Sequence, residues 1–229
     1  MKLDDKMHDV EQNFKILSSF GNGGDDSTPI MSMTISDDLK RFAREYMVSY
    51  GITDEDKIIG IHPGSNSNQK WKRWPAQYFG ELINIIISEW ESYVLVFGDH
   101  KEDDLIKDIL SHVNESSKVN GITDKSLMES AALISLCKVF IGNDSGLLHI
   151  AAATNVITFC IAGPTNINKT SPYGSNSYKV HLNLECQFCY NFNTLRFKCS
   201  QISQYKCLKE LYPKEVYKEI YPVLSQILI

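Results

Sequence analysis

Residues 138–153 read KVFIGNDSGLLHIAAA, so an apolar run, a polar turn and a helix-like run follow one another. The run Lys138–Ile141 is typical of a buried strand, and Leu147–Ala153 is typical of a helix that lies close to a sheet. The turn between them, Asn143-Asp144-Ser145-Gly146, offers Ser145 as the N-cap of that helix. The first amides of a helix point outward, so this unit predicts an anion-binding site at the carboxyl end of a strand.

The same alternation of strand-like and helix-like runs continues on both sides of this unit. Further strands are expected at residues 57–61, 93–97, 118–120 and 156–161, with helices at 75–90, 101–111 and 126–136. Strands that alternate with helices indicate βαβ units. The predicted fold class is therefore α/β, a Rossmann-like doubly wound parallel sheet over residues 57–163. A final amphipathic helix over 213–228 is expected to pack back on this body.

A second loop with the chemistry of an anion site follows the strand at 57–61. There His62-Pro63-Gly64-Ser65 leads into the basic stretch KWKRWP at 70–75. Gly64 allows close backbone approach, Ser65 supplies an amide and a hydroxyl, and Lys72 supplies a cation, a combination that suits phosphate. A solvated basic loop is the alternative interpretation. Because ligands bind beyond the carboxyl ends of parallel strands, this loop and the 143–146 turn are expected to meet.

Three further residues are candidates for the same site. His149 lies one turn after Ser145 on the same helix face, where its ring can donate to a phosphate oxygen. Asp144 is expected to accept from a sugar or ribose hydroxyl, or to hold its turn. Lys125, in the loop 121–127, has an aliphatic stem that can cover a nucleobase. An ordinary helix cap with a buried histidine is the competing interpretation.

Four of the six cysteines follow the spacing Cys186-x2-Cys189-x9-Cys199-x7-Cys207. This spacing is compatible with a tetrahedral zinc site, which would be structural because four thiolates leave no open position. Scattered buried thiols and facultative disulfides stay open as alternatives. The other two, Cys137 and Cys160, lie in apolar runs and are expected in the core.

Composition excludes several classes of function. The net charge of −5 over 229 residues argues against a nucleic-acid partner. Neither a signal peptide nor an apolar run long enough to span a membrane is visible, so a cytoplasmic location is expected, peripheral at the inner face of the membrane. No strand is followed by Gly-x-Gly-x-x-Gly with a later acidic residue, which disfavours a nicotinamide-dependent dehydrogenase.

As an ordered set, these loops resemble the C-terminal half of family-nine glycosyltransferases, the ADP-heptose:lipopolysaccharide heptosyltransferases. The resemblance covers about residues 57–224. Its matching elements are His62-Pro63-Gly64-Ser65, Lys72-Arg73-Trp74-Pro75, Phe97-Gly98, Gly121-Ile122-Thr123 with Ser126-Leu127, Asn143-Asp144-Ser145-Gly146 with His149–Ala153, Gly163-Pro164-Thr165, Pro172-Tyr173-Gly174, Cys186-x2-Cys189 and Cys207-Leu208.

The resemblance implies a GT-B architecture of two Rossmann-like domains and an inverting transfer that needs no metal. The C-terminal domain would bind the nucleotide-diphosphate sugar, ADP-heptose or similar, for transfer to a lipopolysaccharide, glycan or lipid-linked acceptor. By this resemblance the diphosphate would be held by Gly64, Ser65 and Lys72. Asp144, Ser145, Gly146 and His149 would close on the phosphates and the donor sugar, with Lys125 near the base.

The resemblance also implies a division of the chain. Residues 1–56 look like an interdomain segment with a linker and one helix, and residues 57–229 like the nucleotide-sugar-binding domain with a Cys-rich loop and a closing helix. The family's general base is an Asp of the N-terminal domain, and no residue here matches it. We therefore assign no catalytic base, and we expect activity to need an N-terminal half or partner chain. A non-catalytic nucleotide-sugar-binding module or scaffold is the alternative.

Overall fold

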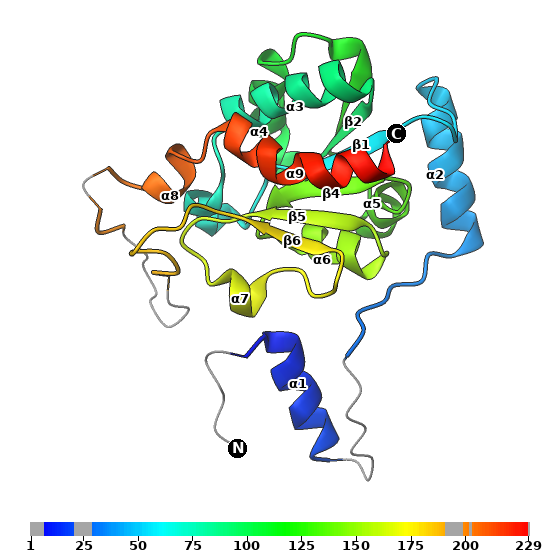
Figure 1. Ribbon diagram of the computed structural model, residues 1–229. Coiled ribbons are helices and arrows are strands. Elements are labelled where there is room, and N and C mark those ends of the chain that lie inside the picture. The colour runs from blue at the N-terminus through cyan, green and yellow to red at the C-terminus, as the bar shows by residue number, and fades with distance from the viewer. Residues whose placement is uncertain (1–6, 21–28, 191–198, 202, 229) are drawn as a thin grey trace.

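A computed structural model describes residues 7–20, 29–190, 199–201 and 203–228. Its centre is a six-stranded sheet in the order β3-β2-β1-β4-β5-β6 (Figure 1), and every strand pair in it is parallel. The strands are β1 (Ile58–His62), β2 (Tyr93–Phe97), β3 (Val119–Ile122), β4 (Val139–Asn143), β5 (Ile157–Ile161) and β6 (Ser177–Val180). This order is that of a doubly wound Rossmann-like sheet, as the sequence predicted.

Helices cover both faces of the sheet. The α-helices are α1 (Asp9–Ser18), α2 (Asp37–Ser49), α3 (Ala76–Trp90), α4 (Asp103–Ser111), α5 (Leu127–Ile134), α6 (Gly146–Ala153), α7 (Ile167–Thr170), α8 (Lys206–Lys209) and α9 (Pro213–Ile227). The 3-10 helices are η1 (Ser67–Lys72), η2 (His100–Glu102) and η3 (Ser116–Lys118). Within the described residues, no helix combines the length and apolar character needed to span a bilayer.

Alternate residues along β1, β2, β4 and β5 pack into two separate hydrophobic clusters. In β1, Ile59 and Ile61 pack with α3, α4 and α9, while Ile58 packs on the other face with α2, α5 and α6. Successive side chains of a strand point to opposite faces, so a strand covered on both sides is apolar throughout. Cys137 and Cys160 lie in the second cluster, which confirms that they belong to the core.

Short or polar elements are those that the sequence did not predict. β6 is a four-residue edge strand, SYKV, whose middle residues are exposed, so it carries no buried apolar run. Residues 1–56 were expected to hold a linker and one helix, but this segment contains two helices, α1 and α2. Residues 21–28, between these helices, lie outside the described residues.

The α1 helix is attached beside α7 rather than to the sheet (Figure 1). His8 Nε2 lies 2.8 Å from the carbonyl of Ser171, and the Tyr173 hydroxyl donates to Glu11 at 3.2 Å. Lys169 Nζ of α7 lies 3.8 Å from Asp9 of α1. These polar contacts place α1 next to the segment that follows β5, near the carboxyl edge of the sheet. The division of the chain at residue 56 stays a prediction.

The closing helix α9 is expected to contribute strongly to stability, because Ile220 on it is fully buried against α3 and the sheet. Ile220→Ala should lower the free energy of unfolding by about 2–5 kcal/mol, since it removes apolar contacts and leaves a cavity. Denaturant unfolding measures this loss. The neighbouring exposed variant Glu219→Ala should change it by less than about 0.5 kcal/mol. Equal effects of the two variants would contradict the packing of α9.

Candidate functional site

A large cleft opens where the carboxyl ends of β1 and β4 lie side by side. Its volume is about 1610 Å³, larger than the roughly 300–1,000 Å³ of an ordinary small-molecule pocket. The chain leaves these two neighbouring strands toward opposite sides of the sheet, which is where such folds bind ligands. Of the eight predicted donor-binding residues, these line the cleft: Ser65, Lys72, Lys125, Asp144, Ser145, Gly146 and His149.

Asn143 fastens the two predicted loops to each other. Its side chain is fully buried at the end of β4. The amide group donates to the carbonyl of Pro63 at 2.6 Å, and its Oδ1 accepts from the backbone amide of Trp74 at 3.0 Å. Asn143 therefore holds the 62–65 loop and the start of α3 against the 143–146 turn. Asn143 was predicted to lie in this turn, but its bridging role was not predicted.

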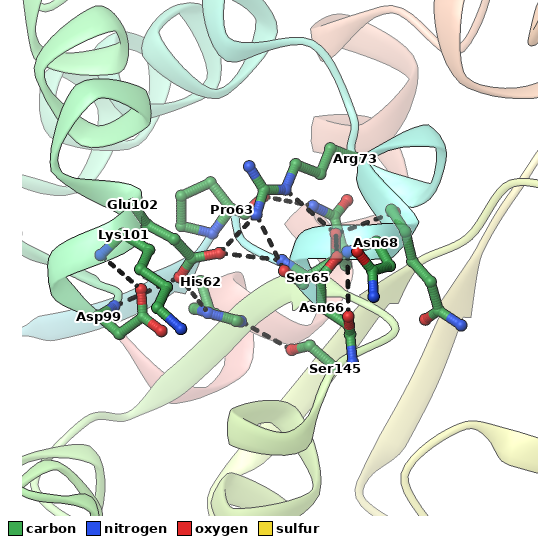
Figure 2. A network of polar contacts seen from close by, with 12 residues as sticks. His62, Pro63, Ser65, Asn66, Asn68, Arg73, Asp99, Lys101, Glu102 and Ser145 are labelled. Carbon is green, nitrogen blue, oxygen red and sulfur yellow. Dashed lines mark hydrogen bonds and ion pairs between the residues drawn. The ribbon is translucent and has the colours of Figure 1, made fainter.

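Glu102 is the centre of a buried polar network under the cleft (Figure 2). Its Oε1 accepts from Arg73 Nη2 at 2.8 Å and from the backbone amide of Ser65 at 3.1 Å. Its Oε2 lies 3.4 Å from Nε2 of His62 and accepts from the amide of Asp99 at 3.3 Å. One carboxylate thus joins the loops that follow β1 and β2.

The Glu102 carboxylate is held in its ionised form by these partners. Burial raises the pKa of its carboxyl, but contacts with His62 and Arg73 and the hydrogen bond from Asp99 outweigh burial, so the pKa lies below its ordinary value. Glu102 was not predicted as a site residue, because a lone Glu in a charged helix start looks solvated. Its position could have indicated a site residue, because Glu102 follows Gly98 at the end of β2, and β2 ends at the same edge of the sheet as β1.

Gly64 and Ser65 interact with Glu102 in this structure. A Cβ built on Gly64 would overlap the Glu102 carboxylate. In this structure it is therefore the Glu102 side chain that comes close to Gly64. The Ser65 amide donates to the same carboxylate. Its hydroxyl donates to the carbonyl of Gln69 at 3.0 Å and accepts from Arg73 Nε at 3.1 Å. The phosphate contacts expected of both residues stay predictions.

Ser145 stands at the N-cap position of α6, as predicted, but its hydroxyl does not cap the helix. Its backbone is extended, and no side-chain hydrogen bond closes the α6 N-terminus. The hydroxyl instead lies 2.7 Å from Nδ1 of His62 (Figure 2). The first amides of α6, beginning at the exposed Gly146, consequently keep their hydrogens directed at the cleft.

Lys72 and Asp144 form an ion pair across the cleft. Lys72 Nζ donates to Asp144 Oδ2 at 3.2 Å, and both side chains are largely buried. The Thr170 hydroxyl donates to the same oxygen at 3.5 Å. An anionic ligand that reaches Lys72 must therefore compete with Asp144 for it.

The remaining predicted residues flank this centre. His149 is half-buried, and burial lowers the pKa of its imidazole, a shift that the nearby Asp144 carboxylate opposes. Lys125 Nζ lies 2.8 Å from Asp124 and 5.2 Å from the centre of the Tyr46 ring. Its contact with a nucleobase stays a prediction.

The Cys-rich segment also lines the cleft, a position that was not predicted from the sequence. Phe188 and Tyr190 face the cleft from positions beside Cys189. The Tyr190 ring lies 4.6 Å from that of Trp71, centroid to centroid, and its hydroxyl accepts from Gln69 at 3.5 Å. An aromatic wall from late in the chain therefore covers η1.

The four cysteines of that segment lie near one another. Burial, and then the neighbouring sulfurs, raise the pKa of the Cys207 thiol to about 11. In the part of the chain that the structure describes, no three His, Cys, Asp or Glu side chains are grouped to hold a metal ion. Zinc binding by Cys186, Cys189, Cys199 and Cys207 stays a prediction.

With this geometry established, comparison with known proteins identifies the family. The model of glycosyltransferase family 9 (heptosyltransferase) matches residues 1–198. The chain belongs to this family. It is 34% identical over 168 residues to lipooligosaccharide heptosyltransferase 2 of Campylobacter jejuni (strain 81116), a match that covers 72% of this chain and 50% of that relative. The chain spans about half the length of the curated relatives it matches.

Solved structures of the family share the fold. The family 9 glycosyltransferase of Veillonella parvula superposes with a TM-score of 0.80 at 22% identity, covering 99% of this chain and 62% of that chain. The ADP-heptose lipopolysaccharide heptosyltransferase II of E. coli gives 0.75 at 22% identity, covering 98% of this chain and 65% of that chain. The predicted α/β fold and family resemblance are confirmed.

Glu102→Gln should destabilise the family 9 chain in a pH-dependent way. A carboxyl with a lowered pKa in the folded state stabilises above its unfolded pKa of about 4.3, and this stabilisation is lost as pH falls through the folded pKa. We expect the variant to lose about 1–3 kcal/mol at neutral pH and the difference to shrink below about pH 4. Denaturant unfolding across pH measures this. Exposed Glu89→Gln should show no such trend, and a constant Glu102 difference would contradict the assignment.

Zinc binding is tested by elemental analysis of chain purified under reducing conditions. The cysteine spacing predicts about one zinc per chain, lost in the Cys186→Ser plus Cys189→Ser variant. Zinc-free protein with unchanged thermal unfolding would contradict this prediction.

Proposed function

We propose that this chain is the donor-binding half of an inverting glycosyltransferase that uses a nucleotide-diphosphate sugar, ADP-heptose or a close relative of it. The acceptor would be a lipopolysaccharide or a related glycan, and the work would be done in the cytoplasm at the inner face of the membrane. The observation that carries this proposal is the cleft at the ends of β1 and β4, where Lys72 and the uncapped amides of α6 meet. Family membership and the E. coli neighbour named for ADP-heptose support the choice of donor.

The proposed chemistry follows from the charge of the leaving group. Transfer of the sugar breaks its bond to the β-phosphate, so negative charge grows on the departing nucleoside diphosphate. Lys72 and the amides that begin at Gly146 would stabilise that charge, because donors fixed before the reaction need no reorganisation. Asp144, released from Lys72 when the diphosphate binds, would accept from a donor-sugar hydroxyl beside Thr170.

We assign no residue of the described chain as the base that deprotonates the acceptor. The proposal therefore includes an N-terminal half, or a partner chain, as the source of that base. A nucleotide-sugar-binding module without turnover is the alternative left by the sequence, and membership in a family of heptosyltransferases does not favour it. Product formation by the 229-residue chain alone, from a lipid-linked saccharide, would contradict the need for a further half.

Lys72→Ala should weaken binding of ADP and ADP-heptose about 10- to 100-fold, the effect of losing a charge-assisted hydrogen bond to phosphate. Asp144→Ala should weaken ADP-heptose but not ADP, because the proposed contact is to the sugar. Calorimetric titration measures both. Lys107→Ala, an exposed lysine of α4 outside the cleft, is the charge-matched control and should bind normally. Absence of ADP-heptose binding, or equal binding by the Lys72→Ala plus Asp144→Ala variant, would overturn the proposal.

A further inference from the structure

A second pocket adjoins the cleft at α7. Its volume is about 750 Å³, within the range of ordinary small-molecule pockets. Successive residues of one short segment divide between the two hollows: Lys169 and Thr170 line the cleft, whereas Asn168 and Ser171 line the pocket. Among the described residues that line the pocket, none is a predicted donor-binding residue. The pocket is therefore separate from the proposed donor site, and the two share α7 as a common wall.

Ser171 brings to this pocket a buried polar group without a partner. The residue is only 1% exposed, and its hydroxyl makes no hydrogen bond within the described part of the chain. Its backbone groups are satisfied, since its amide donates to the carbonyl of Ile167 at 3.2 Å and its carbonyl lies 2.8 Å from Nε2 of His8. A buried hydroxyl that has given up water without gaining a partner is unfavourable. One torsion turns this oxygen between staggered positions, so a polar ligand in the pocket can satisfy it.

The charged side chains of the pocket do not favour an anion. The Tyr173 hydroxyl donates to the Glu11 carboxylate at 3.2 Å, and Lys179 Nζ donates to Asn168 Oδ1 at 3.3 Å. A phosphate that approached Lys179 would also meet the negative charge of Glu11. Sites for phosphate instead combine several cations or convergent amides. The pocket therefore differs in charge character from the cleft, where Lys72 and the amides of α6 meet.

The remaining polar lining is neutral and can both donate and accept hydrogen bonds. Its side-chain amides and hydroxyls belong to Asn155, Asn168, Asn176, Ser171, Ser175 and Ser177.

Sugar hydroxyls have the same dual character, so this lining matches a saccharide better than an anion or an apolar ligand. The Tyr173 ring lies 4.8 Å from the His8 ring, centroid to centroid, and is held at its hydroxyl by Glu11. An aromatic ring has an apolar face and, in tyrosine, a polar tip, which suits the C–H face and the hydroxyls of a sugar ring. The chemistry of the pocket thus points to a neutral sugar unit.

We propose that this pocket binds a neutral sugar unit of the glycan acceptor, with Ser171, Asn168 and Tyr173 as its contacts. This inference rests on the proposed function, which places the sugar donor in the cleft beyond α7. A glycan held in the pocket by one unit would reach past α7 with another and present its hydroxyl to the donor. The donor-binding half would then recognise part of the acceptor itself. The proposal concerns binding alone, and no covalent bond changes in the pocket.

Titration of the 229-residue chain with a soluble glycan tests this pocket. The probe is the deacylated glycan of a truncated lipopolysaccharide that ends in heptose, so that a neutral sugar is its outermost unit. Saturation-transfer NMR detects its binding, and calorimetry measures its affinity. We expect the glycan to bind, and inorganic phosphate not to displace it from the pocket.

Two variants report on the proposed contacts. Ser171→Ala should weaken glycan binding about fivefold, the effect of losing one neutral hydrogen bond. It should leave the thermal unfolding temperature unchanged or raise it, because the hydroxyl has no partner in the free chain. Asn168→Ala should weaken glycan binding similarly, and since Asn168 is exposed, this variant tests the pocket without disturbing the core.

Ser92→Ala is the matched control for the buried serine. Ser92 is also fully buried with a hydroxyl that lacks a partner among the described residues, but it lines neither the cleft nor the pocket. Its variant should bind the glycan like the wild-type chain. All three variants should bind ADP normally, because none of these residues lines the cleft.

The outcomes separate this inference from the proposed function. If ADP binds but the glycan does not, or if the glycan binds equally to the wild-type, Ser171→Ala and Asn168→Ala chains, the pocket inference is overturned while the donor site stands. A lower unfolding temperature of Ser171→Ala with unchanged glycan affinity shows a structural serine and overturns it equally. If neither ADP nor ADP-heptose binds, the proposed function fails. Glycan binding that depends on Ser171 would then leave a saccharide site and overturn its role in placing an acceptor.

Discussion

The buried carboxylate of Glu102 is the contact on which the shape of the cleft depends. A carboxylate taken out of water needs its lone pairs satisfied, and here Arg73, the Ser65 amide, the Asp99 amide and His62 do so. Those partners belong to the loops after β1 and β2, so satisfying one charge fixes two loops at once. The same carboxylate contacts the His62 ring, and the Ser145 hydroxyl lies against the other nitrogen of that ring and does not cap α6.

The strand order explains why residues far apart in sequence share this site. β1 and β4 are neighbours in the sheet, with His62 opposite Gly142 in register, although about eighty residues separate them in the chain. Their loops leave on opposite sides of the sheet and would diverge if nothing joined them. The Asn143 side chain prevents this, because its amide and carbonyl groups bond to Pro63 and Trp74. A cleft remains between loops that are held at their base.

Secondary structure that depends on the sequence of one element could be predicted, whereas side-chain contacts between elements could not. The apolar runs of β1, β2, β4 and β5, and the Ser145–Gly146 start of α6, follow from periodicity and turn chemistry alone. β6 was missed because an exposed edge strand has no buried run. Glu102 and Tyr190 were missed for another reason: their roles exist only once folding brings Arg73 and Trp71 beside them. Lys72 was correctly placed at the cleft, but its ion pair with Asp144 could not be foreseen from spacing.

That ion pair also bears on which anions the cleft can discriminate. Because Lys72 already has a carboxylate partner, the cleft presents little uncompensated positive charge at this point. A singly charged anion such as chloride would replace one negative partner of Lys72 by another and leave the buried Asp144 with only the Thr170 hydroxyl, with no net gain. A ligand with several charges and its own hydroxyl groups can satisfy Lys72, the α6 amides and Asp144 together. Under the proposed function, the pair would therefore favour ligands with several charges over small monovalent ions, without any steric barrier.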